Sequence, residues 1–462
     1  MPVSRTNPYR LLLKRKFPWG IPGLMALVLG FWLASQYFGE PHGYPPGTEE
    51  MALLKIDRDL RLADAMAKDP GWLRWLANAG EPEVVRAEGA DTLQRLWQTQ
   101  WEAAERGEID RHEMPLSPRA VEALEVLRTQ GAGPALLERL RGDGPGLPTP
   151  ESTLRTRLST GSGQWWDAQL LRAYAGVSGP EVGQGALDVF EGETQTLRGH
   201  ALMARGAVWA VVLVGTLCLP WALRHLAGAT VTRARGYSAG WSASLGWTVF
   251  LASTLAWIGF GTVIGIGLVD VTDLPPLGTL VLEAVVRMLP ALIAIGFLFR
   301  RPRHVLRVLG LDRSPDWPLV FGALAALLWF DGALSRTLEH WVRSDPTGGL
   351  SSMDAGLTGL VFVVVSTCLL APLSEEIVYR GVLFRSLANR FGTMPGAVLA
   401  AGVFATIHFY NLYGLASVAL LGLICALSFS ASRRLSTAVA LHVLYNAAVK
   451  LPEWVVYHAS LG

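Results

Sequence analysis

Apolar runs and short polar connections alternate along most of this chain, and one long polar segment interrupts them near the N-terminus. About nine of the runs are long enough for a helix to cross the roughly 30 Å hydrocarbon core of a bilayer. These runs cover about residues 19–38, 206–223, 241–269, 277–299, 317–334, 356–373, 395–411, 414–430 and 436–457. The pattern predicts an all-α polytopic membrane protein with about nine transmembrane helices, an N-terminal anchor followed by an eight-helix core.

The polar segment, residues 39 to about 200, has the apolar periodicity of amphipathic helices rather than of spans. Its helical signals cover residues 48–68, 83–108 and 117–129. Ser117 and Pro118 have the order of an N-cap followed by proline in the first turn. Residues 143–150 are rich in glycine and proline and predict a linker, and residues 151–200 look mixed. We expect a mostly helical domain over 39–205, and we find no catalytic constellation in it.

Charge placement predicts the orientation of the chain. Residues 1–18 carry five basic side chains before the first apolar run, which is rather long for a signal peptide and lacks a clear cleavage site. We therefore favour an uncleaved anchor over a cleaved signal peptide. Arginines are concentrated in the connections expected on the same side as this tail, so the positive-inside rule predicts a cytoplasmic N-terminus. Residues 39–205 are then extracytoplasmic.

Composition agrees with this picture and excludes some functions. The chain is 51% hydrophobic and only 17% charged, against about 25% charged in typical soluble domains. The formal net charge of +2 gives no indication of a nucleic-acid partner. The three cysteines, Cys218, Cys368 and Cys425, all lie in apolar runs and outside any zinc-binding spacing, so neither a disulfide in the polar segment nor a thiol nucleophile is expected.

Polar residues inside the last spans carry the candidate chemistry, because ionisable groups are costly in hydrocarbon. Glu375 precedes the expected turn at Gly392 by 17 residues, and His408 follows it by 16. In an antiparallel hairpin of helices these two side chains lie at nearly the same depth. On the last helix His442 and Asn446 fall at a comparable depth. Three helices are therefore predicted to bring a carboxylate, two imidazoles and an amide together.

Local spacing separates the two adjacent glutamates. Glu376 and Arg380 are four residues apart, with the acid first, which is the better order for pairing on a helix. Glu375 points about 100° away and has no local cation, so it is the candidate base for a water shared with His408. His442 and Asn446 are also four residues apart and could donate hydrogen bonds to an oxyanion. This is a set of groups for peptide hydrolysis without a covalent intermediate.

A different interpretation is a polar network that packs helices in a transporter or scaffold. We find no inverted repeat and no paired broken helices of the kind that transporters carry. Glu283 and Arg287, four residues apart, are expected to form a structural ion pair rather than a substrate contact. Asp331 is either a helix-end residue or a distant partner of the site.

The same residues resemble the CPBP family of intramembrane proteases, which includes the CAAX prenyl endopeptidases. The family pattern is EExxxR, FxxxH and HxxxN or HxxxD. Here it is matched by the two glutamates with Arg380, by Phe404 with His408, and by His442 with Asn446. The resemblance covers about residues 355–450 and implies a glutamate-type protease.

The resemblance implies a role for each matched residue. Glu375 and His408 would activate water, His442 and Asn446 would form the oxyanion hole, and Glu376, Arg380 and Phe404 would support them. No cofactor is implied if the enzyme is of the glutamate type. A zinc ion held by Glu375, His408 and His442 is the alternative, since these are suitable ligand types.

We therefore predict an intramembrane endopeptidase that cleaves near the C-terminus of a membrane-embedded or lipidated protein, similar to the myxosortase-like members or to those tied to bacteriocin maturation. The predicted organisation is a basic tail and anchor over 1–38, the extracytoplasmic domain over 39–205, supporting spans over 206–350 and a catalytic core over 351–462. The bilayer and a substrate protein are the expected partners, with an extracytoplasmic protein as a further one. The alternative function is a non-enzymatic scaffold or immunity-type protein whose extracytoplasmic domain binds a partner.

Overall fold

The computed structural model describes residues 20–38, 44, 47–107, 116–129, 150–231, 241–265, 274–298, 302–338 and 345–460, and all regular elements in these ranges are helices. The basic tail, the predicted linker before Pro150 and several arginines of the connections lie outside the described residues. The chain forms two compact units. Unit 1 comprises residues 1–39, 210–343 and 361–450, and unit 2 comprises 40–209, 344–360 and 451–462.

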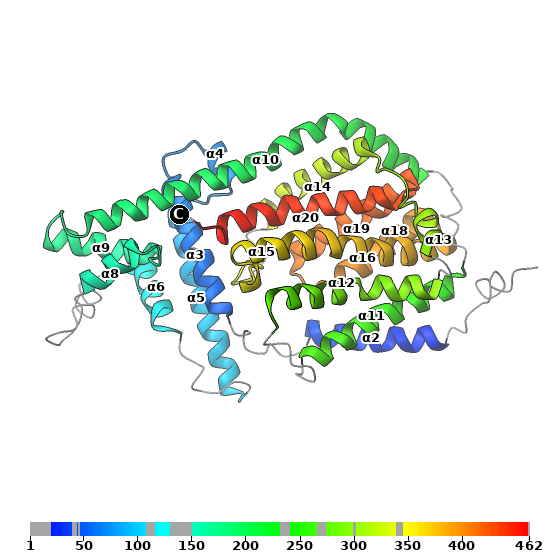
Figure 1. The fold of residues 1–462 in the computed structure, drawn as a ribbon, viewed down its shortest axis with the longest axis horizontal. Coiled ribbons are helices and arrows are strands. Elements are labelled where there is room, and N and C mark those ends of the chain that lie inside the picture. Colours follow the sequence, from blue (N-terminus) through cyan, green and yellow to red (C-terminus); the bar gives the residue numbers. More distant parts are fainter. Residues whose placement is uncertain are drawn as a thin grey trace, which may run out of the picture. The chain divides into compact units, whose positions relative to one another are not determined.

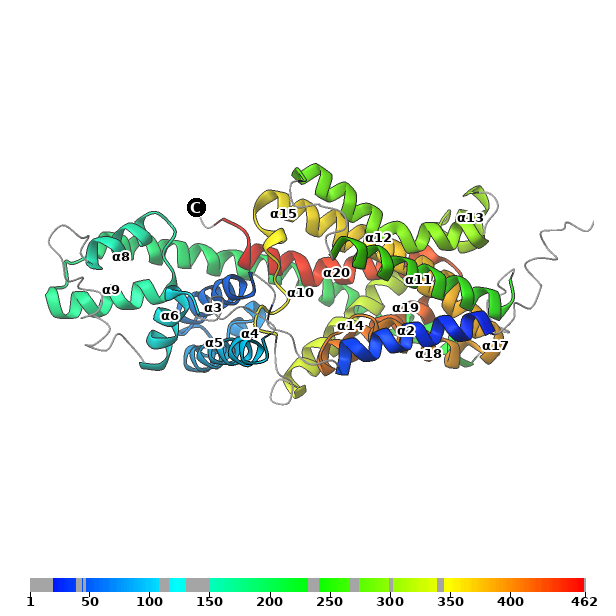
Figure 2. The same ribbon diagram turned by 90° about the horizontal axis from the view of Figure 1, so that it is seen from below.

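Unit 1 contains the apolar helices, which run alongside one another in Figures 1 and 2. They begin with α2 (Gly20–Phe38) and the second half of α10 (Gln184–Val231), in which the boundary between the units falls. The others are α11 (Ala243–Gly265), α12 (Pro276–Leu298), the short α13 (Pro302–Leu309), α14 (Trp317–Leu338), α18 (Thr393–Thr406), α19 (Leu412–Ser432) and α20 (Leu435–Tyr457).

One further helix begins in unit 2, extends without interruption from residue 356 to residue 391 into unit 1, and widens to a π-helix twice. Its segments are α15 (Gly356–Phe362), η3 (Val363–Leu370), α16 (Ala371–Glu375), η4 (Glu376–Phe384) and α17 (Arg385–Phe391). The segments η3 and η4 are π-helical, with the wider i to i+5 hydrogen bonding. Wide turns of this kind are uncommon and occur frequently at functional sites.

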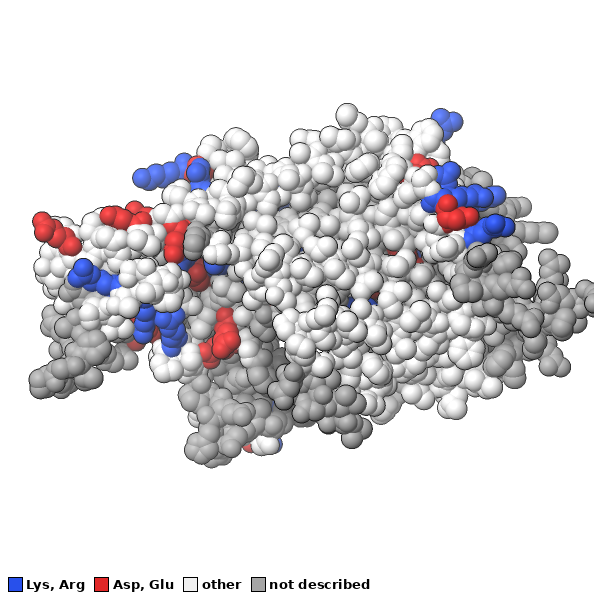
Figure 3. Space-filling model, in the orientation of Figure 1, with Lys and Arg blue, Asp and Glu red and all other residues white. Residues whose placement is uncertain are grey.

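Six described helices are long and apolar enough to cross a membrane, which supports a multi-pass membrane protein. They cover Gln184–Thr230, Ala243–Ile264, Pro276–Leu298, Trp317–Leu338, Gly356–Phe391 and Leu412–Ser432. Gly20–Gln36 and Thr393–Thr406 are shorter apolar helices. Each of the nine predicted runs contains a helix within its described residues, but the count of nine spans stays a prediction. On the face drawn in Figure 3, the surface over α12, α15 and α20 is nearly free of charged side chains.

Close packing of small residues holds the hairpin between α17 and α18. Gly392, between the two helices, has φ of 94°, a conformation that side chains disfavour, so the predicted turn is confirmed at this glycine. A Cβ atom on Gly396 would lie 2.7 Å from the backbone nitrogen of Ala388. A Cβ atom on Gly422 of α19 would lie 3.1 Å from the Phe404 ring and 3.2 Å from Ala401, so this glycine lets α19 pack closely on α18. These contacts fix α18 between α17 and α19.

Unit 2 is helical around a core of its own. Its helices are α3 (Thr48–Ala65), α4 (Gly71–Ala77), α5 (Pro82–Glu105), α6 (Pro118–Thr129), α8 (Pro150–Ser159), α9 (Trp165–Ser178) and the first half of α10. The Ser117 hydroxyl accepts a hydrogen bond from the Ala120 backbone, so the predicted cap of α6 is confirmed. The expectation of a mixed segment over 151–200 is wrong, because three helices occupy it. Asp167 and Gln164 form a capping box that starts α9.

Candidate active site in the membrane unit

Glu376 is the centre of a fully buried ionic network. Its Oε1 lies 2.7 Å from Nη1 of Arg380 and 2.8 Å from Nδ1 of His442. Both Glu376 and Arg380 are at most 1% exposed, and the guanidinium stacks on the Phe404 ring at 4.4 Å. The predicted pairing of Glu376 with Arg380 is therefore confirmed. The additional contact with His442, 66 residues further along the chain, could not be read from local spacing.

Glu375 lies on the same turn but in a different environment. Its side chain is 24% exposed, and Oε2 lies 3.7 Å from Nε2 of His442. Because Nδ1 of His442 faces the carboxylate of Glu376, that nitrogen carries a hydrogen and donates a hydrogen bond to Oε1 of Glu376. The opposite nitrogen of the ring is then directed at Glu375. His442 thus connects the buried glutamate with the accessible one.

His408 lies beyond the end of its helix, which corrects the expectation of a span over 395–411. Helix α18 ends at Thr406, Phe409 has φ of 53°, and the Asn411 side chain caps the start of α19. The last carbonyls of a helix lack backbone donors. Nδ1 of His408 lies 2.6 Å from the carbonyl oxygen of Phe404 and satisfies it. Since a carbonyl can only accept, the Nδ1 of His408 carries the hydrogen, and in the neutral ring Nε2 keeps a free lone pair.

Asn446 contacts the wide-turn segment next to the site. Its Nδ2 donates to the carbonyl oxygen of Thr367 at 2.9 Å. Within η3 the backbone N–H of Ala371 bonds to Ser366, five residues earlier. The next bond of that series would join residue 372 to Thr367, but Pro372 has no N–H. The amide of Asn446 therefore occupies an acceptor that the proline has left free.

Sequence reasoning missed this contact, although Pro372 in the middle of an apolar helix is the signal that could have revealed it. The predicted oxyanion role of Asn446 requires the second hydrogen of the same amide. The structure thus brings Glu375, Glu376, Arg380, Phe404 and His442 into one cluster. Asn446 lies one helical turn beyond His442, and His408 is attached to Phe404.

A second network lies where α12 packs against η3. Oε1 of Glu283 accepts hydrogen bonds from Nε of Arg287 at 2.8 Å and from the hydroxyl of Ser366 at 3.0 Å. The predicted ion pair is confirmed. Ser366 was not singled out from the sequence, and it places this pair directly against the helix that carries Glu375.

A third network resolves the ambiguity over Asp331. The hydroxyl of Tyr445 on α20 donates to Oδ2 of Asp331 on α14, and it lies 2.7 Å from the Ser417 hydroxyl on α19. Three helices are therefore held together by polar groups beside Asn446. Asp331 is a partner of the helix that carries the site rather than a helix-end residue.

The metal alternative depends on how the possible ligand side chains are arranged. Across the described ranges, no three side chains from His, Cys, Asp and Glu lie in positions to hold a metal ion. Both ring nitrogens of His442 face glutamate oxygens, and Nδ1 of His408 is taken by a carbonyl. The zinc alternative stays a prediction, because a ring whose Nδ1 donates to a carboxylate or to a backbone carbonyl can still bind a metal through Nε2.

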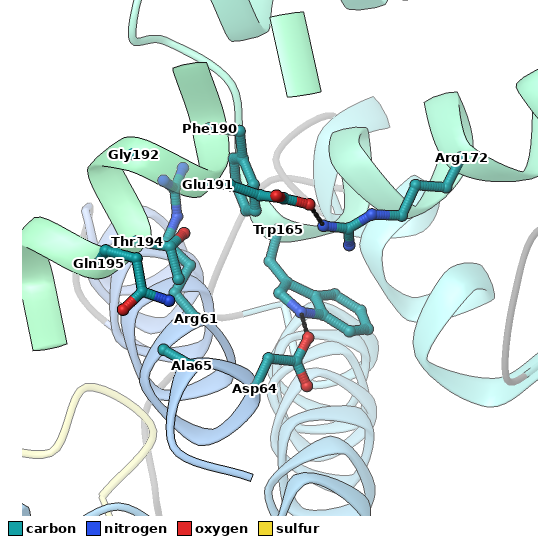
Figure 4. Close-up of a pocket in the computed structure, with 10 residues that line it drawn as sticks. All are labelled: Arg61, Asp64, Ala65, Trp165, Arg172, Phe190, Glu191, Gly192, Thr194 and Gln195. Carbon is teal, nitrogen blue, oxygen red and sulfur yellow. Dashed lines mark hydrogen bonds and ion pairs between the residues drawn. The ribbon is translucent and has the colours of Figure 1, made fainter. Parts of the chain in front are cut away.

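Unit 2 has a cavity of about 360 Å³, shown in Figure 4. Its charged lining groups have partners within the unit. Arg172 pairs with Glu191 at 3.1 Å, and the Trp165 ring donates to Asp64 at 2.6 Å. Arg61 pairs with Asp57 and Glu193 and stacks on Phe190. This pairing argues for a structural role of the charges around the cavity.

Comparison with known proteins agrees with the geometry of unit 1. Residues 357–448 match the family model of the type II CAAX prenyl endopeptidase Rce1-like proteins. The chain is also 28% identical over 156 residues to an uncharacterised 24.3 kDa protein of Escherichia coli, covering 33% of this chain and 71% of that protein. No solved structure matches. The matched segment contains every residue of the glutamate and histidine cluster, and residues 357–448 are therefore assigned to the CPBP family.

Proposed function

We propose that the protein is an intramembrane endopeptidase that hydrolyses a peptide bond near the C-terminus of a membrane-embedded or lipidated protein. The observation that carries this proposal is the pairing of the two glutamates through His442. One glutamate is buried and positions the imidazole, whereas the other is accessible and faces the opposite ring nitrogen. A purely structural network would not require an accessible carboxylate at its end.

In the proposed reaction Glu375 takes a proton from a water molecule, and the water oxygen forms a bond with the scissile carbonyl carbon. Nε2 of His408, which has a free lone pair in the neutral ring, accepts a hydrogen bond from the same water. His442, whose Nδ1 donates to Glu376, carries a second proton on Nε2 in this step and donates it as a hydrogen bond to the oxyanion, together with the second amide hydrogen of Asn446. As the carbon–nitrogen bond breaks, the proton on Glu375 passes to the leaving amine. Two peptides result, and no covalent enzyme intermediate is formed.

The aromatic ring of Phe404 supports this arrangement in two ways. It stacks on the Arg380 guanidinium, and it lies 5.9 Å from the His442 ring in an edge-to-face geometry. Its backbone carbonyl also fixes the His408 ring. One residue thus positions groups on both sides of the proposed water, which gives a physical reason for its place in the site.

The experiment compares C-terminal peptides from membranes of cells with the wild-type protein, Glu375→Gln or His408→Ala. We expect both variants to lose the cleaved C-termini while keeping their thermal stability in detergent. Arg390→Gln, on the exposed end of α17, is the matched control and should cleave normally. Unchanged cleavage by either site variant contradicts the proposed roles. Cleavage that persists after exhaustive chelation would support the route without a metal.

The location we propose is the bacterial inner membrane, with the N-terminus cytoplasmic and residues 39–205 extracytoplasmic. Unit 2 has its own buried core around Trp166 and Leu60 and is suited to contact a partner protein or the substrate. The scaffold alternative makes a different prediction. If it holds, deleting residues 45–195 abolishes the cellular phenotype, whereas Glu375→Gln leaves it intact.

A further inference from the structure

One face of helix α12 in unit 1 is buried against the protein near its C-terminal end and is partly exposed near its middle. We call this partly exposed part the opening. Ala291, Ala294 and Leu298 lie within about 40° of Arg287 around the helix and are at most 2% exposed. On the same face the Arg287 side chain is 38% exposed and that of Glu283 is 27% exposed. Since α12 packs against η3, α16 and η4, this opening lies beside the helix that carries Glu375.

The Arg287 guanidinium has hydrogen-bonding capacity to spare at this opening. Its Nε donates to Glu283, and no bond is formed by Nη1 or Nη2 within the described structure. A guanidinium carries four N–H groups on those two nitrogens and is suited to bind a carboxylate in a bidentate manner. Arg287 is also near the middle of a 23-residue apolar helix, where ionisable residues are costly and indicate a functional site.

We propose that Arg287 binds the free α-carboxylate of the peptide on the C-terminal side of the bond that is cleaved. This inference rests on the proposed endopeptidase function and adds a determinant of where the enzyme cuts. A carboxylate is favoured over a lipid phosphate because the opening lies on the face of α12 that packs against the protein. Glu283, held by Ser366, keeps the guanidinium in place and also competes electrostatically with the bound anion.

The geometry sets the length of the leaving peptide. Glu283 contacts Ser366, which precedes Glu375 by nine residues on the same continuous helix. Because η3 is π-helical as far as Leu370, the α-helical rise of about 1.5 Å per residue gives an upper limit of about 14 Å for this separation along the axis. An extended chain covers about 3.3 Å per residue, so the stretch from Ser366 to Glu375 corresponds to at most about four residues of extended peptide. The site therefore favours cleavage a few residues before a free C-terminus.

The test measures binding, so that it does not depend on turnover. The probe is a fluorescein-labelled mixture of four-residue apolar peptides, prepared as the free acid and as the C-terminal amide. Wild-type protein in phosphatidylcholine nanodiscs should bind the acid about 10- to 100-fold more tightly than the amide, as charged hydrogen bonds typically provide. Arg287→Gln should bind the two forms equally, and Arg390→Gln should behave like the wild type.

The Glu283→Gln variant separates an anion site from a structural ion pair. It removes the competing carboxylate, so we expect severalfold tighter binding of the acid, which is opposite to the effect of Arg287→Gln. A purely structural pair would make both variants lose binding together, and that result overturns the proposal. Equal binding of acid and amide by the wild type also overturns it.

Two further comparisons distinguish this proposal from the binding of a lipid phosphate and from the proposed catalytic mechanism. If discrimination disappears in phosphatidylglycerol nanodiscs but persists in phosphatidylcholine, the guanidinium binds lipid phosphate and the assignment to a peptide carboxylate is overturned. If Glu375→Gln still cleaves membrane proteins while Arg287 retains its discrimination, the proposed mechanism fails and the anion site stands.

Discussion

Removing the buried carboxylate of Glu376 should cost far more stability than breaking an exposed ion pair of the same spacing. Glu376→Ala leaves the Arg380 guanidinium, only 1% exposed, without its counter-ion. Breaking a buried pair in this way costs about 3–5 kcal/mol, because an uncompensated charge stays in the interior. The matched exposed pair is Asp91 and Arg95 on α5, also four residues apart, with side chains 64% and 30% exposed. Disrupting that pair should cost about 0.3–0.5 kcal/mol.

A double-mutant cycle measures the difference. In Glu376→Ala with Arg380→Met neither charge remains, so the double variant should regain about 2–3 kcal/mol relative to the sum of the single variants. Unfolding of the full-length protein in mixed detergent and SDS micelles gives the free energies. Cleavage should not return in the double variant, because Nδ1 of His442 has lost its acceptor. Additive free energies, or restored cleavage, would refute this account of the network.

Three further predictions concern other contacts. Asn446→Ala should lower the stability by about 1 kcal/mol, and adding Pro372→Ala should restore the melting temperature by providing a backbone N–H, but not cleavage. Tyr445→Phe removes the hydroxyl that binds Asp331 and should lower kcat together with thermal stability; an unchanged kcat would limit this contact to packing. Burial raises the pKa of Glu122 above 4.5, so stability should fall as pH rises from about 4.5 to that raised pKa and stay lower above it. Glu122→Gln should remove this fall, as melting curves at several pH values can show.

Contacts within one helix or hairpin could be predicted from the sequence. The pairs of Glu376 with Arg380 and of Glu283 with Arg287 follow from the spacing of four residues, and both are present. The turn at Gly392 follows from the conformational freedom of glycine between two apolar runs. These features depend only on residues that are near one another in the chain, and a single sequence contains that information.

Contacts between helices depend on pitch and rotation, which spacing alone does not fix. The π-helical turns of η3 and η4 change the direction of the side chains that follow them. No local sequence pattern predicted either segment. The link from Glu376 to His442 and the end of α18 before His408 both depend on how neighbouring helices meet. Pro372 was visible in the sequence, but its consequence for Asn446 appears only once the opposing helix is in place.

The packing around the two adjacent glutamates explains why Glu376 is suited to orient His442 and Glu375 is suited to act as the base. Arg380 and the Phe404 ring enclose Glu376, so that carboxylate can remain charged in the interior only as part of a fixed network. A glutamate fixed in this way can orient His442, but it cannot approach a water. Glu375 has no such enclosure and is 24% exposed, so it can exchange protons with bound water. Exchanging the two roles would require moving Arg380 by about one residue along the helix, since a cation can neutralise only the carboxylate that it can reach.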